Sequence, residues 1–514
     1  MGGESVASVK DAVKTMATLK LTDKSDLRAT HARVPLLYLG GMMRPSLFGN
    51  VAVQQHTSIE VAAKVYSKSF PTTMIDAFWS HSWRAPHWQK IIMLLLFYNG
   101  IPATIAGTIG AIVGLILAVL EYLPSMIEST SAVQADKDKE YGFFVWSTLF
   151  GIVVYLLTLV FWQSRRTIFL DKVCIHQTDD LLRRKGIESI GAYLKQCNSM
   201  LVLWDPTYVT RLWCVFELAA FLYAHQRDRN RTVICRPVIL GPTTLTTFII
   251  IGVEVMGILL LPADTIGFFV GGSSFVMLTL LVRLLRRYHR SLKMLRKDFR
   301  TFMVDRAGCF CCNEANHHLQ GCTILCDREL VEGCIMTWFG STEKFNQVVQ
   351  QTLFNTFSTQ LGKVAFPYHI MVLALVPSFW AFMDLAGSYW IAEEYDLALS
   401  QFCIGLALWI GALPTVFALT STVAASNWVQ KSRGAFLDWL IAAFCGAGCC
   451  SAVFVFSGSG LLSIEWLGPI GGTLGYIAIV VFISLGSFYL LGNASAKGSS
   501  AMDEADDVRA TRLG

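Results

Sequence analysis

Long apolar segments constrain this chain more than any other feature of its sequence. A helix of about 20 apolar residues crosses the roughly 30 Å of hydrocarbon in a bilayer. Segments of this kind lie at residues 103–123, 143–162, 245–261, 266–282, 367–386, 397–420, 436–457 and 469–491. Only 15% of all residues are charged, against about 25% in soluble domains. The sequence therefore predicts an α-helical polytopic membrane protein with about eight spans. Its predicted partner is the lipid bilayer.

The charges between these segments predict how the chain crosses the bilayer. The connection at 124–141 is net acidic, whereas the segments at 164–242 and 283–300 are rich in Lys and Arg. Basic connections stay on the cytosolic side of a membrane. We therefore expect a multi-pass integral membrane protein with both termini in the cytosol. Glu254 lies in the middle of a span, and we expect it to be paired inside the helix bundle.

A cytosolic domain is indicated between and around the first apolar hairpins. Strand-like segments at 75–79, 168–170, 199–204 and 232–240 alternate with helix-like segments. This β-α-β order is typical of a parallel sheet flanked by helices. The sequence predicts a discontinuous α/β domain built from residues 71–100 and 164–242, with membrane hairpins inserted at 101–163 and 243–284. The remaining parts are a lead-in at 1–70, a basic and Cys-rich segment at 285–365, four spans at 366–492 and a tail at 493–514. Within the first part, a helix after Pro86 is expected to end at Asn99 and Gly100.

Polar residues gather where the predicted parallel strands end. In open α/β sheets, ligands bind beyond the carboxyl ends of the strands. The residues at those ends are Ser80, His81, Ser82, Trp83, Asp171, Lys172 and Asp205, and Glu217 lies on the next helix. The sequence therefore predicts one site formed by these loops.

Two stretches of this domain resemble a known family. The strand and turn DAFWSHSWR and the run SMLVLWDPTYVTRLWCVFEL, which ends at Leu218, are similar to Toll/interleukin-1 receptor (TIR) domains. FLDKVCIHQ together with WCVFELA also resembles the TIR-like fungal heterokaryon-incompatibility domain. The resemblance covers about a quarter of the chain. Its most specific part is the pattern S-x4-W-x-P-x-Y-x4-W-C-x2-E-L that begins at Ser199.

The resemblance implies two activities. Some TIR domains signal by self-association, and others cleave the nicotinamide–ribose bond of NAD. In the catalytic members the glutamate of the WCxxEL motif is the key residue, and Glu217 occupies that position here. A carboxylate beside the ribose would stabilise the oxocarbenium-like charge that forms as nicotinamide leaves. The residues that would contact NAD are Ser80, Ser82, Trp83, Asp171 and Trp213.

Other interpretations of the same residues remain open. Glu217 can be an exposed helix residue, Asp171 a turn cap, and Trp83 and Trp213 packing residues. The chain as a whole can be a scaffold without catalysis, or a transporter or channel with a regulatory TIR-like domain. We expect no nucleic-acid partner.

The predicted domain departs from the TIR pattern at its end. A TIR domain has a fifth strand and helix, whereas here the fourth strand leads into the second membrane hairpin. We predict that residues 323–340 supply the missing strand and helix.

A Cys- and His-rich run follows the basic helix. It contains Cys309, Cys311, Cys312, His317, His318, Cys322 and Cys326. Four thiolate or imidazole ligands are enough for a structural zinc ion, although this spacing matches no established zinc finger. The alternatives are S-acylation of Cys309, Cys311 or Cys312 next to the membrane, or ordinary buried thiols.

Overall fold

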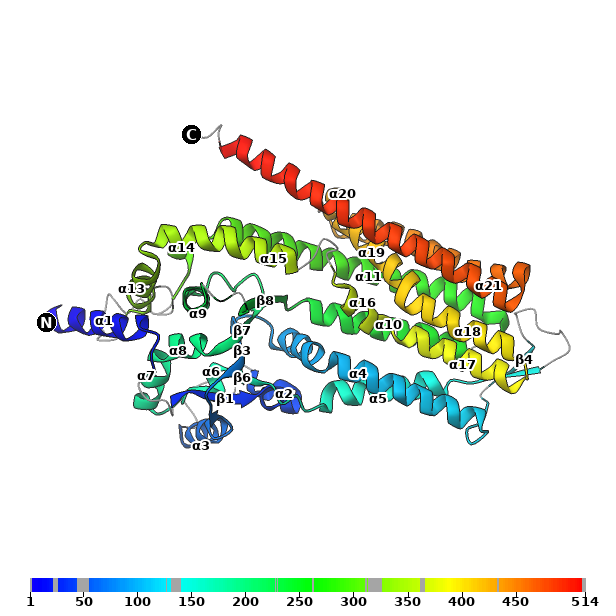
Figure 1. Cartoon of the computed structure of the whole chain (residues 1–514), viewed down its shortest axis with the longest axis horizontal. Helices are drawn as coiled ribbons and strands as arrows, with labels where there is room; N and C mark the ends of the chain where they lie inside the picture. Colours follow the sequence, from blue (N-terminus) through cyan, green and yellow to red (C-terminus); the bar gives the residue numbers. More distant parts are fainter. Residues whose placement is uncertain are drawn as a thin grey trace. The chain divides into compact units, whose positions relative to one another are not determined.

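The computed structural model divides the chain into two compact units, and each unit is assembled from three separate parts of the sequence (Figure 1). Unit 1 comprises Met1–Tyr98, Gln163–Gly241 and Ser291–Gln360, and unit 2 comprises Asn99–Trp162, Pro242–Arg290 and Leu361–Gly514. The structure describes residues 2–21, 26–43, 55–125, 127–130, 140–226, 228, 230–260, 263–309, 312, 326–360, 366–431 and 434–510.

Unit 1 contains a mixed sheet and short helices. Its strands are β1 (Arg28–His31), β2 (Phe70–Pro71), β3 (Ile75–His81), β6 (Thr167–Phe169), β7 (Cys197–Trp204) and β8 (Thr232–Pro237). Its helices are α1 (Gly2–Ala17), α2 (Arg33–Gly40), α3 (Gln55–Tyr66), α6 (Asp171–Cys174), α7 (Asp180–Glu188), α8 (Ile190–Lys195), α9 (Leu212–Ala224), α13 (Asp327–Phe339), α14 (Thr342–Val348) and α15 (Phe354–Gln360), with the first turns of α4 (His87–Val119) and the end of α11 (Ala263–Arg300).

The sheet has the strand order β2-β1-β6-β3-β7-β8. Strands β6, β3, β7 and β8 are parallel, as their sequences predict. If these four strands are numbered along the chain, their spatial order in the sheet is 2-1-3-4. This is the start of a doubly wound sheet, and its switch point lies between β3 and β7. The predicted parallel sheet is confirmed for these four strands only, because β1 pairs antiparallel with both β6 and β2 and makes the sheet mixed. Segments as short as β1 and β2 carry too little alternation to be recognised as strands.

Helices cover both faces of this sheet. Phe78 of β3 stacks on Phe169 of β6, with ring centroids 4.6 Å apart, and Phe169 in turn contacts Tyr193 of α8. Trp79, the next residue of β3, donates its indole N–H to the hydroxyl of Tyr98 in α4 at 2.8 Å. Successive residues of a strand point to opposite faces. Helix α8 therefore covers one face and the start of α4 covers the other.

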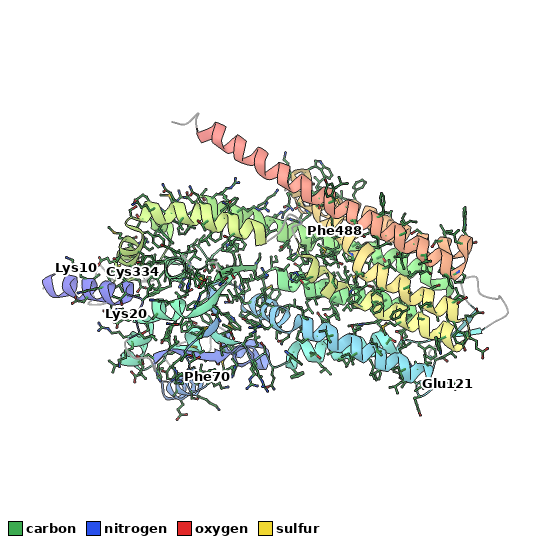
Figure 2. All side chains as sticks on the ribbon, in the orientation of Figure 1. Lys10, Lys20, Phe70, Glu121, Cys334 and Phe488 are labelled. Atoms are coloured by element: carbon green, nitrogen blue, oxygen red, sulfur yellow. The ribbon has the colours of Figure 1, made fainter. Side chains whose placement is uncertain are left out.

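The segment at 1–70 takes part in the folded unit and is more than a lead-in. Helix α1 packs along α13, and the indole N–H of Trp338 donates to the carbonyl of Ala17 at 2.9 Å. Figure 2 labels Cys334, whose thiol lies 3.9 Å from the carbonyl oxygen of Val13. Of the predicted segment 323–340, the helix is present as α13. Residues 323–325, the predicted fifth strand, lie outside the described residues.

The described residues of unit 2 are helical apart from one hairpin and the connecting segments. It holds the remainder of α4 and α11, the strands β4 (Ile127–Thr130) and β5 (Glu140–Phe143), and the helices α5 (Trp146–Phe161), α10 (Leu240–Leu260), α16 (Tyr368–Leu375), α17 (Pro377–Ile391), α18 (Tyr395–Ala407), α19 (Leu413–Ala425), α20 (Asn427–Gln430) and α21 (Ala435–Ala510). In the described part of the chain, five helices are long and apolar enough to cross a membrane, and six if the bent pair α16–α17 counts as one span. These helices are consistent with a membrane protein.

Helix α4 runs without interruption through the residues expected to end it. It continues from His87 to Val119, past Asn99 and Gly100. The side-chain amide of Asn99 donates to the carbonyl of Leu159 at 2.9 Å. Because its side chain is hydrogen-bonded to α5, Asn99 does not form the side-chain bonds to its own backbone by which an Asn weakens a helix. The predicted stop at Asn99 and Gly100 is therefore wrong.

Two helices of unit 2 are joined through a buried carboxylate. Asp384 of α17 is 1% exposed. It accepts hydrogen bonds from the backbone N–H of Ser147 at 2.7 Å and of Thr148 at 2.9 Å. These are the second and third residues of α5, whose N-terminus has no side-chain cap of its own. Asp384 therefore acts as an N-cap supplied by a helix more than 200 residues away.

Glu254 of α10 is buried in unit 2. The hydroxyl of Ser273 in α11 donates to the Glu254 carboxylate of α10 at 3.0 Å, so the expected pairing of Glu254 is confirmed.

Within α21, Gly468 has a φ of 73° and precedes Pro469. A Cβ on Gly472 would lie 2.3 Å from the carbonyl oxygen of Ser463. The chain therefore breaks at Gly468, and its two arms approach at backbone distance.

Glycine allows α4 and α5 to pack closely. A Cβ on Gly114 would lie 2.5 Å from the carbonyl oxygen of Trp146, whereas one on Gly272 would meet nothing within 4 Å. We expect Gly114→Ala to destabilise the protein by about 1–3 kcal/mol, since a backbone atom cannot rotate away from the new methyl group. Gly272→Ala is the control and should be neutral or slightly stabilising, because Ala favours a helix. Thermal unfolding in detergent measures both, and equal melting temperatures would contradict this packing.

Candidate functional site

Three side chains form a hydrogen-bonded row at the carboxyl end of β3. The hydroxyl of Ser80 donates to the Glu217 carboxylate at 2.5 Å. The same Ser80 oxygen lies 2.7 Å from the hydroxyl of Tyr208. Because Ser80 has a single proton and gives it to Glu217, Tyr208 is the donor in the second bond. Ser80 and Tyr208 are fully buried, and Glu217 is partly exposed.

Three elements around the switch point of the sheet place this row. Ser80 is the penultimate residue of β3, Tyr208 lies in the loop after β7, and Glu217 lies on α9. The loop is held by Asp205, whose carboxylate accepts from the Thr207 hydroxyl at 2.7 Å. Helix α9 also contacts β3, which places Glu217 over the end of that strand.

The surroundings of Glu217 favour its protonated form. Burial raises the pKa of Glu217 to about 8, the Ser80 hydrogen bond opposes this, and the negative charge of Asp171 adds to the rise. A carboxyl group with this pKa changes charge near physiological pH. Groups with such shifted pKa values cluster at functional sites.

A second group of polar residues lies around the Trp83 indole. Its N–H donates to the Asp171 carboxylate at 2.9 Å. The Lys172 ammonium lies 3.9 Å from the centre of the Trp83 ring, and that of Lys90 lies 5.2 Å away. Burial lowers the pKa of both lysines to about 8, and the charge of Asp171 opposes the change in each. This group combines an aromatic face with positive charge.

Ser82 links this second group to the loop after β7. The Lys90 ammonium donates to the backbone carbonyl of Ser82 at 3.0 Å, and the hydroxyl oxygens of Thr207 and Ser82 lie 2.7 Å apart. His81, the last residue of β3, places its ring edge-on to Trp83 with centroids 4.4 Å apart. Burial and the charge of Lys90 lower the pKa of His81, so its imidazole is neutral at pH 7.

The structure separates Trp213 from the other predicted contact residues. Its indole N–H donates to Asp327 of α13 at 3.2 Å, and its ring packs on Phe216. Trp213 therefore fastens α9 to α13. Ser80, Ser82, Trp83, Asp171 and Glu217 all lie in the two polar groups just described.

Sequence reasoning did not single out Tyr208, Thr207 or Lys90 as site residues. Tyr208 and Thr207 were within reach of a prediction, because both follow β7 directly inside the WDPTY stretch. Lys90 was not, since it lies in an apolar helical run and only the tertiary structure turns its ammonium toward Ser82.

The Cys-rich run is described only at three of its predicted ligands. The thiols of Cys312 and Cys326 lie 3.7 Å apart, too far for a disulfide. Cys311, His317, His318 and Cys322 lie outside the described residues. Among the residues that are described, no group of three or more His, Cys, Asp and Glu side chains could hold a metal ion. Stoichiometric zinc in the purified protein would indicate the metal site, and a hydroxylamine-sensitive acyl group would indicate S-acylation.

No family model, curated protein or solved structure matches this chain.

Proposed function

We propose that the chain is a membrane-tethered TIR-like protein whose cytosolic domain cleaves the nicotinamide–ribose bond of NAD. The observation that carries this proposal is the Glu217 carboxylate, which lies at the switch point of a doubly wound sheet and bonds to Ser80. In sheets of this order, that edge is where nucleotide ligands bind.

The chemistry requires one carboxylate beside the ribose. The C1′–N bond breaks, neutral nicotinamide leaves with the electron pair, and water adds to C1′ with loss of a proton. Positive charge develops on the ribose during this step, and the ionised Glu217 stabilises it. The nicotinamide ring of NAD is itself a cation, and an opposite charge nearby favours the ionised carboxylate. Bound NAD therefore lowers the pKa of Glu217 and generates the active form.

The remaining residues of the site suit the rest of the dinucleotide. Trp83 offers an aromatic face for a ring of the substrate, and Lys90 and Lys172 give the surrounding loops a positive potential that attracts the diphosphate. Tyr208 and Ser80 hold the Glu217 carboxylate in place. Self-association through the same domain would be the means by which a signal switches this activity on.

An assay on the full chain tests the proposal. Two preparations are incubated with NAD: the protein diluted in detergent, and the protein concentrated in liposomes. Nicotinamide release from each is followed by chromatography. We expect release by the wild type and by Glu60→Ala, an exposed glutamate of α3 that serves as the control. Glu217→Ala should lower the rate by about 100-fold or more. Release that survives Glu217→Ala would remove Glu217 from the mechanism, and no release in any state would favour the non-catalytic scaffold.

A further inference from the structure

An arginine cluster in unit 2 combines positive charge with incomplete pairing. Arg283, Arg286 and Arg290 lie on α11, about one turn apart, where the apolar part of that helix ends. Among the described residues, Asp438 at the start of α21 is the single carboxylate that forms ion pairs with this cluster. Three guanidinium groups thus share one negative charge.

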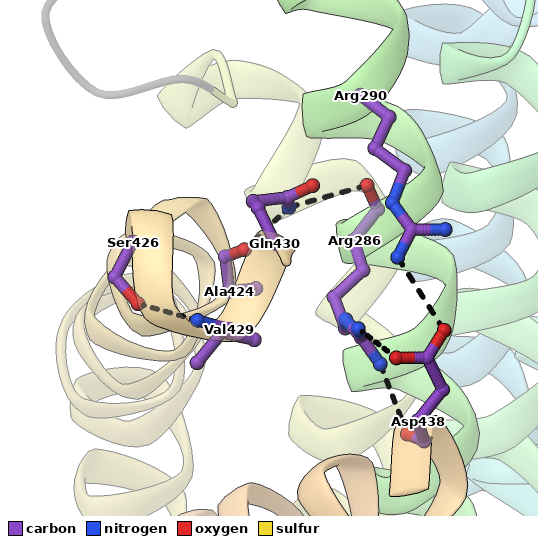
Figure 3. Close-up of polar contacts among 7 residues, drawn as sticks. All are labelled: Arg286, Arg290, Ala424, Ser426, Val429, Gln430 and Asp438. Carbon is purple, nitrogen blue, oxygen red and sulfur yellow. Dashed lines mark hydrogen bonds and ion pairs between the residues drawn. The ribbon is translucent and has the colours of Figure 1, made fainter. Parts of the chain in front are cut away.

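The inner arginine, Arg286, makes the closest contacts with Asp438. Arg286 is 4% exposed, and it donates to the Asp438 carboxylate at 2.8 Å and to the Asp438 backbone carbonyl at 2.9 Å. Arg290 reaches the other carboxylate oxygen only at 3.6 Å. Figure 3 shows Asp438 below both arginines, with Gln430 donating to the backbone carbonyl of Arg286. Arg286 therefore fixes the cluster, and Arg290 keeps donors available.

Arg283 forms no ion pair with any carboxylate in the described part of the chain. Its guanidinium lies 3.5 Å from the centre of the Trp439 ring, and its Nη1 atom is buried without a hydrogen-bond partner. A buried guanidinium nitrogen without an acceptor is costly, because it has lost its hydrogen bond to water and gained no other. An anionic acceptor from outside the chain would remove this cost.

The surroundings of the cluster fit the edge of a bilayer. Asp438 lies in the first turn of the candidate span Ala435–Ala452, and Arg283 directly follows the apolar run of α11. Trp439 and Trp428 are 45% and 59% exposed. Exposed tryptophans are enriched at the level of the lipid headgroups, and basic sites between spanning helices bind anionic headgroups.

We propose that Arg283 and Arg290 bind the phosphate of an anionic membrane lipid, with Arg286 and Asp438 as the support that positions them. Arginine suits this ligand because its planar fork matches two phosphate oxygens. The acyl chains of the lipid would lie against the apolar part of α11 and the start of α21. This proposal is independent of the activity toward NAD.

Native mass spectrometry of the full chain tests the site. The protein in neutral detergent is titrated with dioleoyl phosphatidylglycerol, with dioleoyl phosphatidylcholine, and with inorganic phosphate. We expect one tightly bound phosphatidylglycerol in the wild type, about fivefold weaker binding in Arg283→Gln or Arg290→Gln, and more than about tenfold weaker binding in the double variant. Lys297→Gln, an exposed change about two turns further along α11, should bind as the wild type does.

Three outcomes would overturn the proposal. These are unchanged phosphatidylglycerol binding in the double variant, equal binding of phosphatidylcholine, and displacement of the lipid by millimolar inorganic phosphate. The last result would assign the cluster to a free anion. Should the double variant not fold, the two single variants decide the question, because both leave the Arg286–Asp438 pair intact.

Discussion

Replacing Glu217 by Gln is expected to lower the rate of nicotinamide release by about 100-fold to 1000-fold. Glutamine keeps the size of the side chain and its contact with Ser80, so the loss reports the missing negative charge and not a cavity. Initial rates at saturating NAD, with matched melting temperatures for the two proteins, measure this effect. A rate for the Glu217→Gln variant within a few fold of the wild type would show that the charge plays no part.

The pH profile tests the same residue in the wild type. The pKa of Glu217 is raised to about 8, so only about a tenth of it is ionised at pH 7. In the proposed mechanism the ionised form is the active one, so kcat/KM should rise with pH and level off above about pH 8. The value of kcat should level off at lower pH, because kcat reports the complex and bound NAD is a cation.

Ser80→Ala provides a second readout of this assignment. The Ser80 hydrogen bond lowers the pKa of Glu217, so its removal should move the midpoint of kcat/KM to higher pH. In the Glu217→Gln variant, the rise of kcat/KM with pH should be absent, because glutamine does not ionise. An identical profile in the wild type and in Ser80→Ala would mean that another group controls the rate.

Asp384→Ala is expected to produce the largest loss of stability. Its carboxylate satisfies two backbone N–H groups at the start of α5 and lies at the positive end of that helix. Removal leaves two buried donors unpaired, which costs about 3 kcal/mol. We expect the melting temperature to fall by about 5 to 10 °C. Thermal unfolding in detergent measures it.

Two further variants distinguish the loss of the α5 cap from the loss of a negative charge as such. Asp384→Asn retains one oxygen acceptor and should lose about half as much. Asp396→Ala removes an exposed acid from the first turn of α18 and should change the melting temperature by only a degree or two. If Asp396→Ala proved as harmful as Asp384→Ala, capping of α5 would not be the cause.

The sequence alone predicted the features that depend on local pattern. The continuous apolar runs of β3, β7 and β8 identified parallel strands, because both faces of such strands are covered. Ser80 was singled out because residues after parallel strands meet at one edge, and Glu217 because it occupies the glutamate position of the WCxxEL motif in the family resemblance. The antiparallel strands β1 and β2 were missed, since four residues and two residues carry no period that can be read.

The carboxyl edge of the sheet was thus determined by the sequence, and its chemistry by the tertiary structure. Spacing along the chain placed Ser80 and Glu217 near one edge. The contact between them, the buried ammonium of Lys90 and the raised pKa of Glu217 all depend on which faces pack together and exclude water. The same holds in unit 2, where Asp384 of α17 caps α5, a helix more than 200 residues away in the sequence. Hydrogen bonds and desolvation act between residues far apart in sequence, and no local pattern encodes them.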